Sequence, residues 1–287
     1  MILEAFEPSF MQRALMAGLL AVLATSVVGT WVVLRGMAFL GDALAHGVIP
    51  GIALAILWGF SPIVGALAAG AIMAGVISLV SADSTVREDT GIGLLFVGML
   101  SLGIVIISKA RSFATEVTAL LFGDVLAVTS TDLIGQAVAT AIVLVLGLVL
   151  HRPFLALTFN SMKAKTLGMR PGLAHVAMMV LVALSIVASF QAVGTLLVFG
   201  LLVGPPATAS LVTTRIPLIM ATSTLFGASA VFFGLLISFH GGTAGGATMA
   251  GLSIAQFFVV LVIVRLLGLV RRAGRRNEAT EVSAVTT

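Results

Sequence analysis

Long apolar runs, each roughly 20 residues in length, follow one another along almost the whole chain, with short polar segments between them. A helix of about 20 residues rises about 30 Å, which is the thickness of the hydrocarbon core of a bilayer. Runs of this length therefore predict membrane-spanning helices. We place them at residues 12–34, 37–58, 62–82, 91–108, 133–150, 173–190, 193–212, 217–238 and 249–270.

The composition leads to the same fold class. Only 9% of the 287 residues are charged, whereas a soluble globular domain carries about 25% charged residues. So few charges cannot cover a surface that faces water. We therefore predict an all-α, polytopic helical membrane protein with about eight or nine transmembrane helices. Residues 1–272 would form a single transmembrane domain, and residues 273–287 a polar cytoplasmic tail that is disordered.

Two segments differ from the other apolar runs. Residues 112–128 are apolar but contain Glu116 and Asp124, and they suit a short interfacial or re-entrant helix better than a full crossing. The first twelve residues contain two Glu and neither Lys nor Arg. A cleaved signal peptide begins with a basic region, so we expect the first apolar run to be retained as a span.

The basic residues favour one orientation in the membrane. If the C-terminal arginines are cytoplasmic, alternation through nine spans places eleven Lys and Arg residues on the cytoplasmic side and three on the other, with Arg265 inside the last span. Cytoplasmic loops carry such an excess of Lys and Arg. We therefore predict an N-terminus outside and a C-terminus in the cytoplasm. An even number of spans would place one of the two termini on the opposite side of the membrane.

Several functional classes lose support. The chain is basic, with a net charge of +4, but its basic residues lie between apolar runs, where they would face anionic membrane lipid; we expect no nucleic-acid partner. Cysteine is absent, which excludes thiolate metal sites. The sequence contains neither a phosphate-binding G-x-x-x-x-G-K-[ST] motif nor H-E-x-x-H, so neither ATP hydrolysis nor zinc protease chemistry is expected of this chain.

The second run carries a carboxylate and an imidazole at helical spacing. If Arg35 marks the cytoplasmic boundary, Asp42 lies roughly 10 Å deep and His46 roughly 16 Å deep, close to the bilayer midplane. Residues four apart project from the same face of a helix, with Cβ atoms about 5–6 Å apart. Pro50 follows four residues later and disturbs the helix, which frees backbone carbonyls near the same depth.

Ionisable residues at this depth usually line a polar pathway. Carboxylate oxygen and imidazole nitrogen suit Zn²⁺, Mn²⁺ or Fe²⁺, whereas Cu⁺ prefers sulfur. We expect no permanently bound cofactor, because two ligands hold an ion weakly enough for it to leave, as transport requires. Two alternatives stay open: Asp42 and His46 could bond only to each other and lock the helix, or they could relay protons.

Other polar residues are weaker candidates. Glu116, Asp124 and His240 could line an outer vestibule, and Asp132 looks like a helix N-cap. In the longest polar inner loop, Asn160 would cap a short helix that carries Lys163 and Lys165 and ends at Gly168. Such a helix could dock another protein or could simply connect two spans.

Five motifs occur in order along the chain: VLR at 33–35, GDALAHGVIPG at 41–51, LFGDVL at 121–126, VGTLLV at 193–198 and PPATA at 205–209. In these motifs the sequence resembles the permease subunits of zinc, manganese and iron ABC importers, often called the ABC-3 family. The resemblance covers nearly all of residues 10–270. In detail it is most similar to permeases that carry zinc.

The resemblance implies a homodimer in a bacterial plasma membrane, working with a cytoplasmic ABC ATPase and an extracytoplasmic metal-binding protein. It implies that Asp42 and His46 match the metal-pathway positions of the family. It also places the ATPase contact in the loop TFNSMKA at 158–164, which includes Asn160 and Ser161. Family members often have Asp where this chain has Asn160; both residues cap helices well, so the change need not prevent docking.

Together these observations predict the membrane-spanning permease subunit of an ATP-driven importer of divalent metal ions, with zinc as the expected cargo. Manganese or iron is the alternative cargo within the same class. A proton-coupled secondary transporter is the alternative from a different class, and it would take up its substrate without an ATPase partner.

Overall fold

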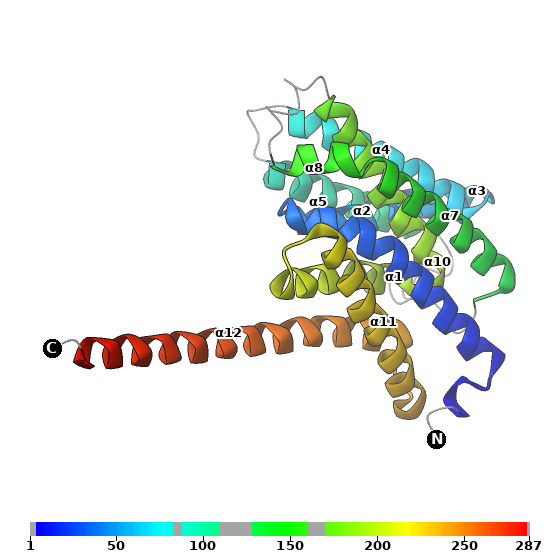
Figure 1. The fold of residues 1–287 in the computed structure, drawn as a ribbon. Helices are drawn as coiled ribbons and strands as arrows, with labels where there is room; N and C mark the ends of the chain where they lie inside the picture. Colours follow the sequence, from blue (N-terminus) through cyan, green and yellow to red (C-terminus); the bar gives the residue numbers. More distant parts are fainter. Residues whose placement is uncertain (1–3, 83–87, 109–127, 160–169, 286–287) are drawn as a thin grey trace.

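The computed structural model describes residues 4–82, 88–108, 128–159 and 170–285. Within these ranges the fold is all-helical, with no strand, as predicted (Figure 1). The helices are a short η1 (Glu4–Phe6), α1 (Ser9–Leu34), α2 (Ala38–Gly47), α3 (Ile49–Trp58), α4 (Pro62–Ala82), α5 (Glu88–Ile107), α7 (Ser130–Val149), α8 (His151–Phe159), α10 (Pro171–Val212), α11 (Ile216–Gly241) and α12 (Gly245–Val285).

The second predicted span is interrupted in the middle. α2 ends at Gly47 and α3 begins at Ile49, with Pro50 in the first turn of α3. Proline is tolerated in a first turn, where its missing N–H would have no partner in the helix. The disturbance that Pro50 predicted is therefore confirmed, and it divides the span just after the turn that carries His46.

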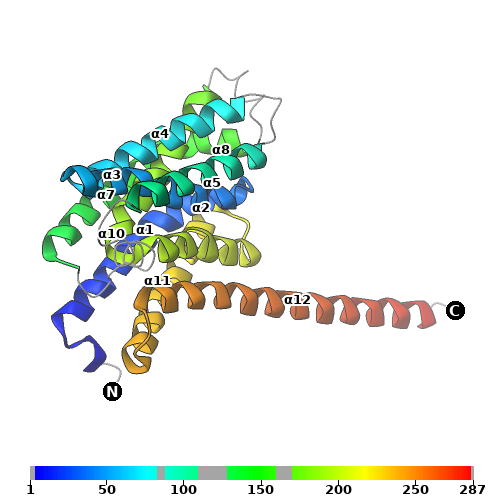
Figure 2. The same ribbon diagram turned by 180° about the vertical axis from the view of Figure 1, so that it is seen from behind.

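The predicted spans 173–190 and 193–212 are joined in the structure, because α10 continues as one helix from Pro171 to Val212. No proline or cap lies at the predicted boundary, so nothing local stops the helix. Figures 1 and 2 show that the two halves of α10 run in different directions. Its first half, Pro171–Phe190, is long enough to cross a membrane, and its second half contains the shorter apolar segment Leu197–Val212.

Eight segments of the described chain are long and apolar enough to span a bilayer, within the predicted eight to nine. With Leu197–Val212 as a further crossing the number is odd. The two ends of the chain lie far apart (Figures 1 and 2), and the orientation of the termini in the membrane stays a prediction.

The C-terminal helix extends into the segment for which a disordered tail is predicted, and the division into a membrane domain and a tail stays a prediction. α12 continues through the polar residues to Val285 and projects from the molecule (Figure 1). No proline lies in residues 270–285, so the local sequence contains no strong helix breaker. Little of the membrane-spanning part of α12 is buried, whereas most of α1 is buried.

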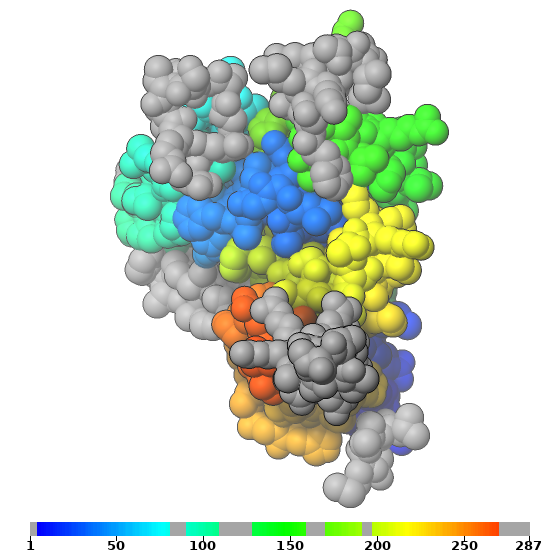
Figure 3. All heavy atoms as spheres, turned by 60° about the vertical axis from the view of Figure 1, so that its left-hand side comes forward, coloured from blue at the N-terminus to red at the C-terminus, as the bar shows by residue number. Residues whose placement is uncertain are grey.

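α1 is the central helix of the fold. It packs against α7, α10 and α11, and the amide of Gln136 in α7 donates a 2.9 Å hydrogen bond to the carbonyl of Ala17. At its C-terminal end, Arg35 donates to Nδ1 of His175 at 3.1 Å. This bond connects the end of α1, and therefore the start of α2, to the first turns of α10. The face from which α12 projects exposes the α1–α2 junction, drawn in blue (Figure 3).

Candidate metal pathway site

Asp42 and His46 lie on one face of α2, as their spacing predicted. The Nε2 atom of His46 is 3.5 Å from the Oδ1 atom of Asp42. A strong hydrogen bond between nitrogen and oxygen spans about 2.7–3.2 Å, so the pair is longer than that. Mutual hydrogen bonding is therefore a weak account of why these two residues occur together.

The same separation suits one shared metal ion. Transition-metal bonds to imidazole nitrogen and carboxylate oxygen are about 2.0–2.2 Å long, so two such ligands at a tetrahedral angle lie about 3.4 Å apart. The observed 3.5 Å between Nε2 and Oδ1 matches this value with almost no movement of the side chains. The separation of the two atoms is thus compatible with a shared cation, and the role of Asp42 and His46 as metal ligands stays a prediction.

Both side chains are partly accessible. The exposed fraction is 17% for His46 and 24% for Asp42, so the pair is neither sealed inside the fold nor fully turned outwards. The Nδ1 atom of His46 is buried and has no hydrogen-bond partner among the described residues. The ring of His46 packs edge-on against Phe96 of α5, with centroids 5.5 Å apart.

At this site the described residues of one chain supply only two potential ligands, the side chains of Asp42 and His46. Within the described residues, no group of three His, Cys, Asp or Glu side chains is placed to hold a metal ion. Zn²⁺ in a closed protein site has about four ligands. The described residues therefore form an incomplete site, and an ion at Asp42 and His46 would need further ligands from outside this part of the chain, such as water or a second molecule.

Two glycines let neighbouring helices press against the back of α2. At Gly41 an added Cβ would collide with the side chain of Leu202 in α10, and at Gly47 it would lie 3.0 Å from the Cγ atom of Met73 in α4. α2 is therefore clamped on its buried side, directly behind Asp42 and His46. Small residues inside a span are typical of close helix packing in membranes, but the sequence alone did not single out these two.

Asp132 has a structural partner, and the prediction of an N-cap at this position is wrong by one turn. The N-cap of α7 is Thr129, whose side chain accepts from the backbone N–H of Asp132 at 3.3 Å. The carboxylate of Asp132 accepts in return from the backbone N–H of Thr129 at 3.0 Å. This reciprocal capping box accounts for the carboxylate without a ligand.

His240 lies in the last turn of α11. Its Nδ1 atom lies 2.9 Å from the carbonyl oxygen of Leu236, and its ring packs edge-on against Phe239. The ring is thus held by its own helix. A role for His240 in an outer vestibule stays a prediction.

The remaining predicted site residues lie outside the described residues. Glu116 and Asp124 fall in 109–127, and the docking residues fall in 160–169: Asn160, Ser161, Lys163, Lys165 and Gly168. Their roles stay predictions. The chain leading to the docking segment is nevertheless helical, since α8 ends at Phe159.

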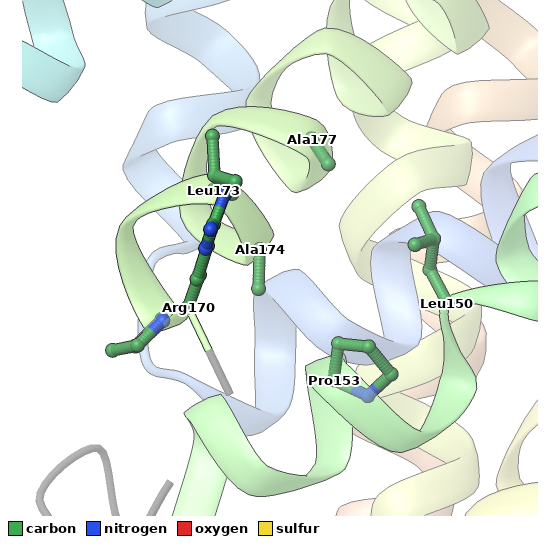
Figure 4. Close-up of a pocket in the computed structure, with 7 residues that line it drawn as sticks. Leu150, Pro153, Arg170, Leu173, Ala174 and Ala177 are labelled. Carbon is green, nitrogen blue, oxygen red and sulfur yellow. The ribbon is translucent and has the colours of Figure 1, made fainter. Parts of the chain in front are cut away.

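A pocket of about 320 Å³ lies between α8 and the start of α10. Figure 4 shows Leu150 and Pro153 on one side and Arg170 with Leu173 on the other. Its lining is almost entirely apolar, with Arg170 as the only charged residue. The pocket therefore lies beside Arg170, where the described chain resumes after the predicted docking segment.

The helices define a multi-pass membrane protein with a carboxylate and an imidazole on one face of a span. The model of the ABC 3 transport family matches residues 7–265, and the chain belongs to this family.

Individual relatives match the sequence of this chain over nearly its whole length. The chain is 36% identical over 278 residues to the manganese transport system membrane protein MntC of Halalkalibacterium halodurans, covering 97% of this chain and 95% of that protein. It is 31% identical over 265 residues to a probable iron transport system membrane protein of Haemophilus influenzae, covering 92% and 97%. Among solved structures, PsaBC from Streptococcus pneumoniae in complex with Fab matches with a TM-score of 0.81 and 32% identity, covering 91% of this chain and 95% of that chain.

Proposed function

We propose that this chain is the permease subunit of an ATP-driven importer of divalent transition-metal ions in a bacterial plasma membrane. The single observation that carries the proposal is the pair of Asp42 and His46, whose ligand atoms lie 3.5 Å apart inside a membrane-spanning helix. A carboxylate and an imidazole at this separation and depth match a cation in transit, since ionisable groups within a span mark pathways for ions or protons.

The cargo that we propose is Mn²⁺ or Fe²⁺ in the first place. The relatives named above are a manganese and an iron transport protein, whereas zinc rests on resemblance in sequence detail alone. The ligand pair itself accepts all three ions. Competition between Mn²⁺, Fe²⁺ and Zn²⁺ for uptake through the intact importer would rank them directly.

We propose a homodimer, because the described residues of one chain supply an incomplete ligand set. A second copy related by a two-fold axis would bring a second carboxylate and a second imidazole and so raise the number of protein ligands to four. ATP hydrolysis would take place on separate ATPase subunits that dock on the 160–168 segment, including Lys163 and Lys165, and a separate extracytoplasmic protein would deliver the ion. The proposed orientation has the N-terminus outside and the C-terminus in the cytoplasm.

The test is metal uptake by cells that lack their own importer and produce this chain with its ATPase and binding protein. Asp42→Ala and His46→Ala should each reduce uptake strongly, while Asp132→Ala serves as a matched carboxylate control, since that residue is engaged in a helix cap. If both pathway variants take up metal as well as the unmodified chain, Asp42 and His46 are not ligands on the route.

A further inference from the structure

Phe96 of α5 lies over the face of α2 that carries the ligand pair. Its ring packs edge-on against two rings of α2: His46, at 5.5 Å between centroids, and Phe39, at 5.6 Å. Phe39 and His46 are seven residues apart, which is about two helical turns and about 10.5 Å along the axis. The ring of Phe96 therefore lies between them, at the level of the turn that carries Asp42.

The order of residues along α2 gives this contact a direction. From the end marked by Arg35, the face carries first Phe39, then Asp42 and then His46. An ion that leaves the ligand pair along this face towards the Arg35 end must pass the rings of Phe39 and Phe96. Neither ring offers a ligand that could replace water, and apolar constrictions of this kind close ion pathways by dewetting.

The two rings have room to separate. Phe39 is 45% exposed in the single chain, so its ring is not fixed by a packed core. On the α5 side the ring of Phe39 faces Gly93, where an added Cβ would lie 3.9 Å from it. The main contacts of α5 are with α2, α3 and α4, and its outward face is exposed at Leu94 and Val97. α5 therefore lies at the edge of the fold, with Ile92 on its inner side in the main core and its outer side exposed.

We infer that Phe39 and Phe96 form the gate between the metal ligands and the Arg35 end of the pathway. This inference rests on the proposed function, and in the proposed orientation the gate closes the site towards the cytoplasm. While the rings touch, a bound ion stays at Asp42 and His46; when α5 and α2 separate, the ion passes inwards.

The test uses the complete importer, permease with its ATPase, in proteoliposomes that enclose a fluorescent metal indicator. Mn²⁺ influx is measured without ATP and with ATP. Phe96→Ala and Phe39→Ala should each raise the ATP-independent influx severalfold, because the apolar closure is lost. Phe258→Ala is the matched control, since Phe258 is an exposed residue of α12 that does not contact α2. Phe96→Trp should restore the seal, since it keeps a large apolar ring.

The outcomes separate the gate from the function. Suppose that the unmodified importer shows ATP-driven Mn²⁺ uptake but neither alanine variant shows raised ATP-independent influx. This result would overturn the gate and leave the proposed function standing. No ATP-driven metal uptake in the unmodified importer overturns the proposed function itself. Should Phe96→Ala fail to fold, Phe39→Ala decides alone, because Phe39 is half-exposed and its removal leaves no cavity in the core.

Discussion

Gly29 of α1 lies directly against the main-chain carbonyl oxygen of Leu202 in α10, so closely that any Cβ at position 29 would overlap this oxygen. The carbonyl faces outwards from its own helix because residue 206 is proline and has no N–H for the carbonyl four residues earlier. The side chain of Leu202 also packs on Gly41, next to Asp42. Leu202 therefore joins α1, α10 and the helix that carries the metal ligands.

Gly29→Ala should destabilise the protein. A methyl group at this position must push the α10 backbone away, and overpacking of this kind costs about 1–3 kcal/mol. The destabilisation can be measured as a lower thermal midpoint of the purified protein in detergent, taken as the temperature at which half of the monodisperse peak is lost. Gly75→Ala is the control, because an added Cβ there meets nothing within 4 Å. Equal midpoints for the two variants would show that α1 and α10 do not approach as described.

The capping box of α7 should matter for stability and not for transport. Thr129→Ala and Asp132→Ala each remove one partner and should each cost about 1 kcal/mol. Because the two side chains satisfy each other, the double variant should cost less than the two single losses combined. Metal uptake, corrected for the amount of folded protein, should stay unchanged. Lost uptake with intact stability would instead make the Asp132 carboxylate part of an outer metal route.

The two tryptophans should report two different environments. Trp31 is buried, with 1% of its surface exposed, whereas Trp58 is 72% exposed at the end of α3. Tryptophan prefers the interface between membrane and water, so the fluorescence of Trp58 should be quenched strongly by lipids brominated near the headgroup. The variants Trp31→Phe and Trp58→Phe isolate the two signals. Similar quenching in both would contradict this placement of the α3–α4 turn.

Charge as well as shape should matter at the ligand pair. Asp42→Asn keeps the size of the side chain but removes its negative charge, and changes around metal ligands commonly cost about 10–100-fold in affinity. We expect Mn²⁺ binding to the purified importer, measured by equilibrium dialysis, to weaken by at least about 100-fold. If the Asp42→Asn variant binds Mn²⁺ with unchanged affinity, the cation binds elsewhere in the protein.

The predictions made from sequence were accurate where the cause is local. Apolar runs of about one bilayer thickness located the spans, since lipid allows only segments whose backbone bonds are satisfied internally. A spacing of four residues was enough to place Asp42 and His46 on one face, and Pro50 was enough to predict the break after them. The N-cap of α7 was missed because Thr129 and Asp132 both fit a cap by residue type, and only the hydrogen bonds distinguish their positions.

The sequence by itself determined that this chain is a bundle of membrane helices with a carboxylate and an imidazole on one face of the second span. Only the tertiary structure decided what surrounds that pair. Phe96 reaches Phe39 and His46, and Leu202 reaches Gly29 and Gly41, across long stretches of chain. In lipid, an apolar helix is compatible with any apolar neighbour, so its sequence pattern does not specify which helix it contacts. The neighbour is selected by shape complementarity between whole helices and not by the local order of residues.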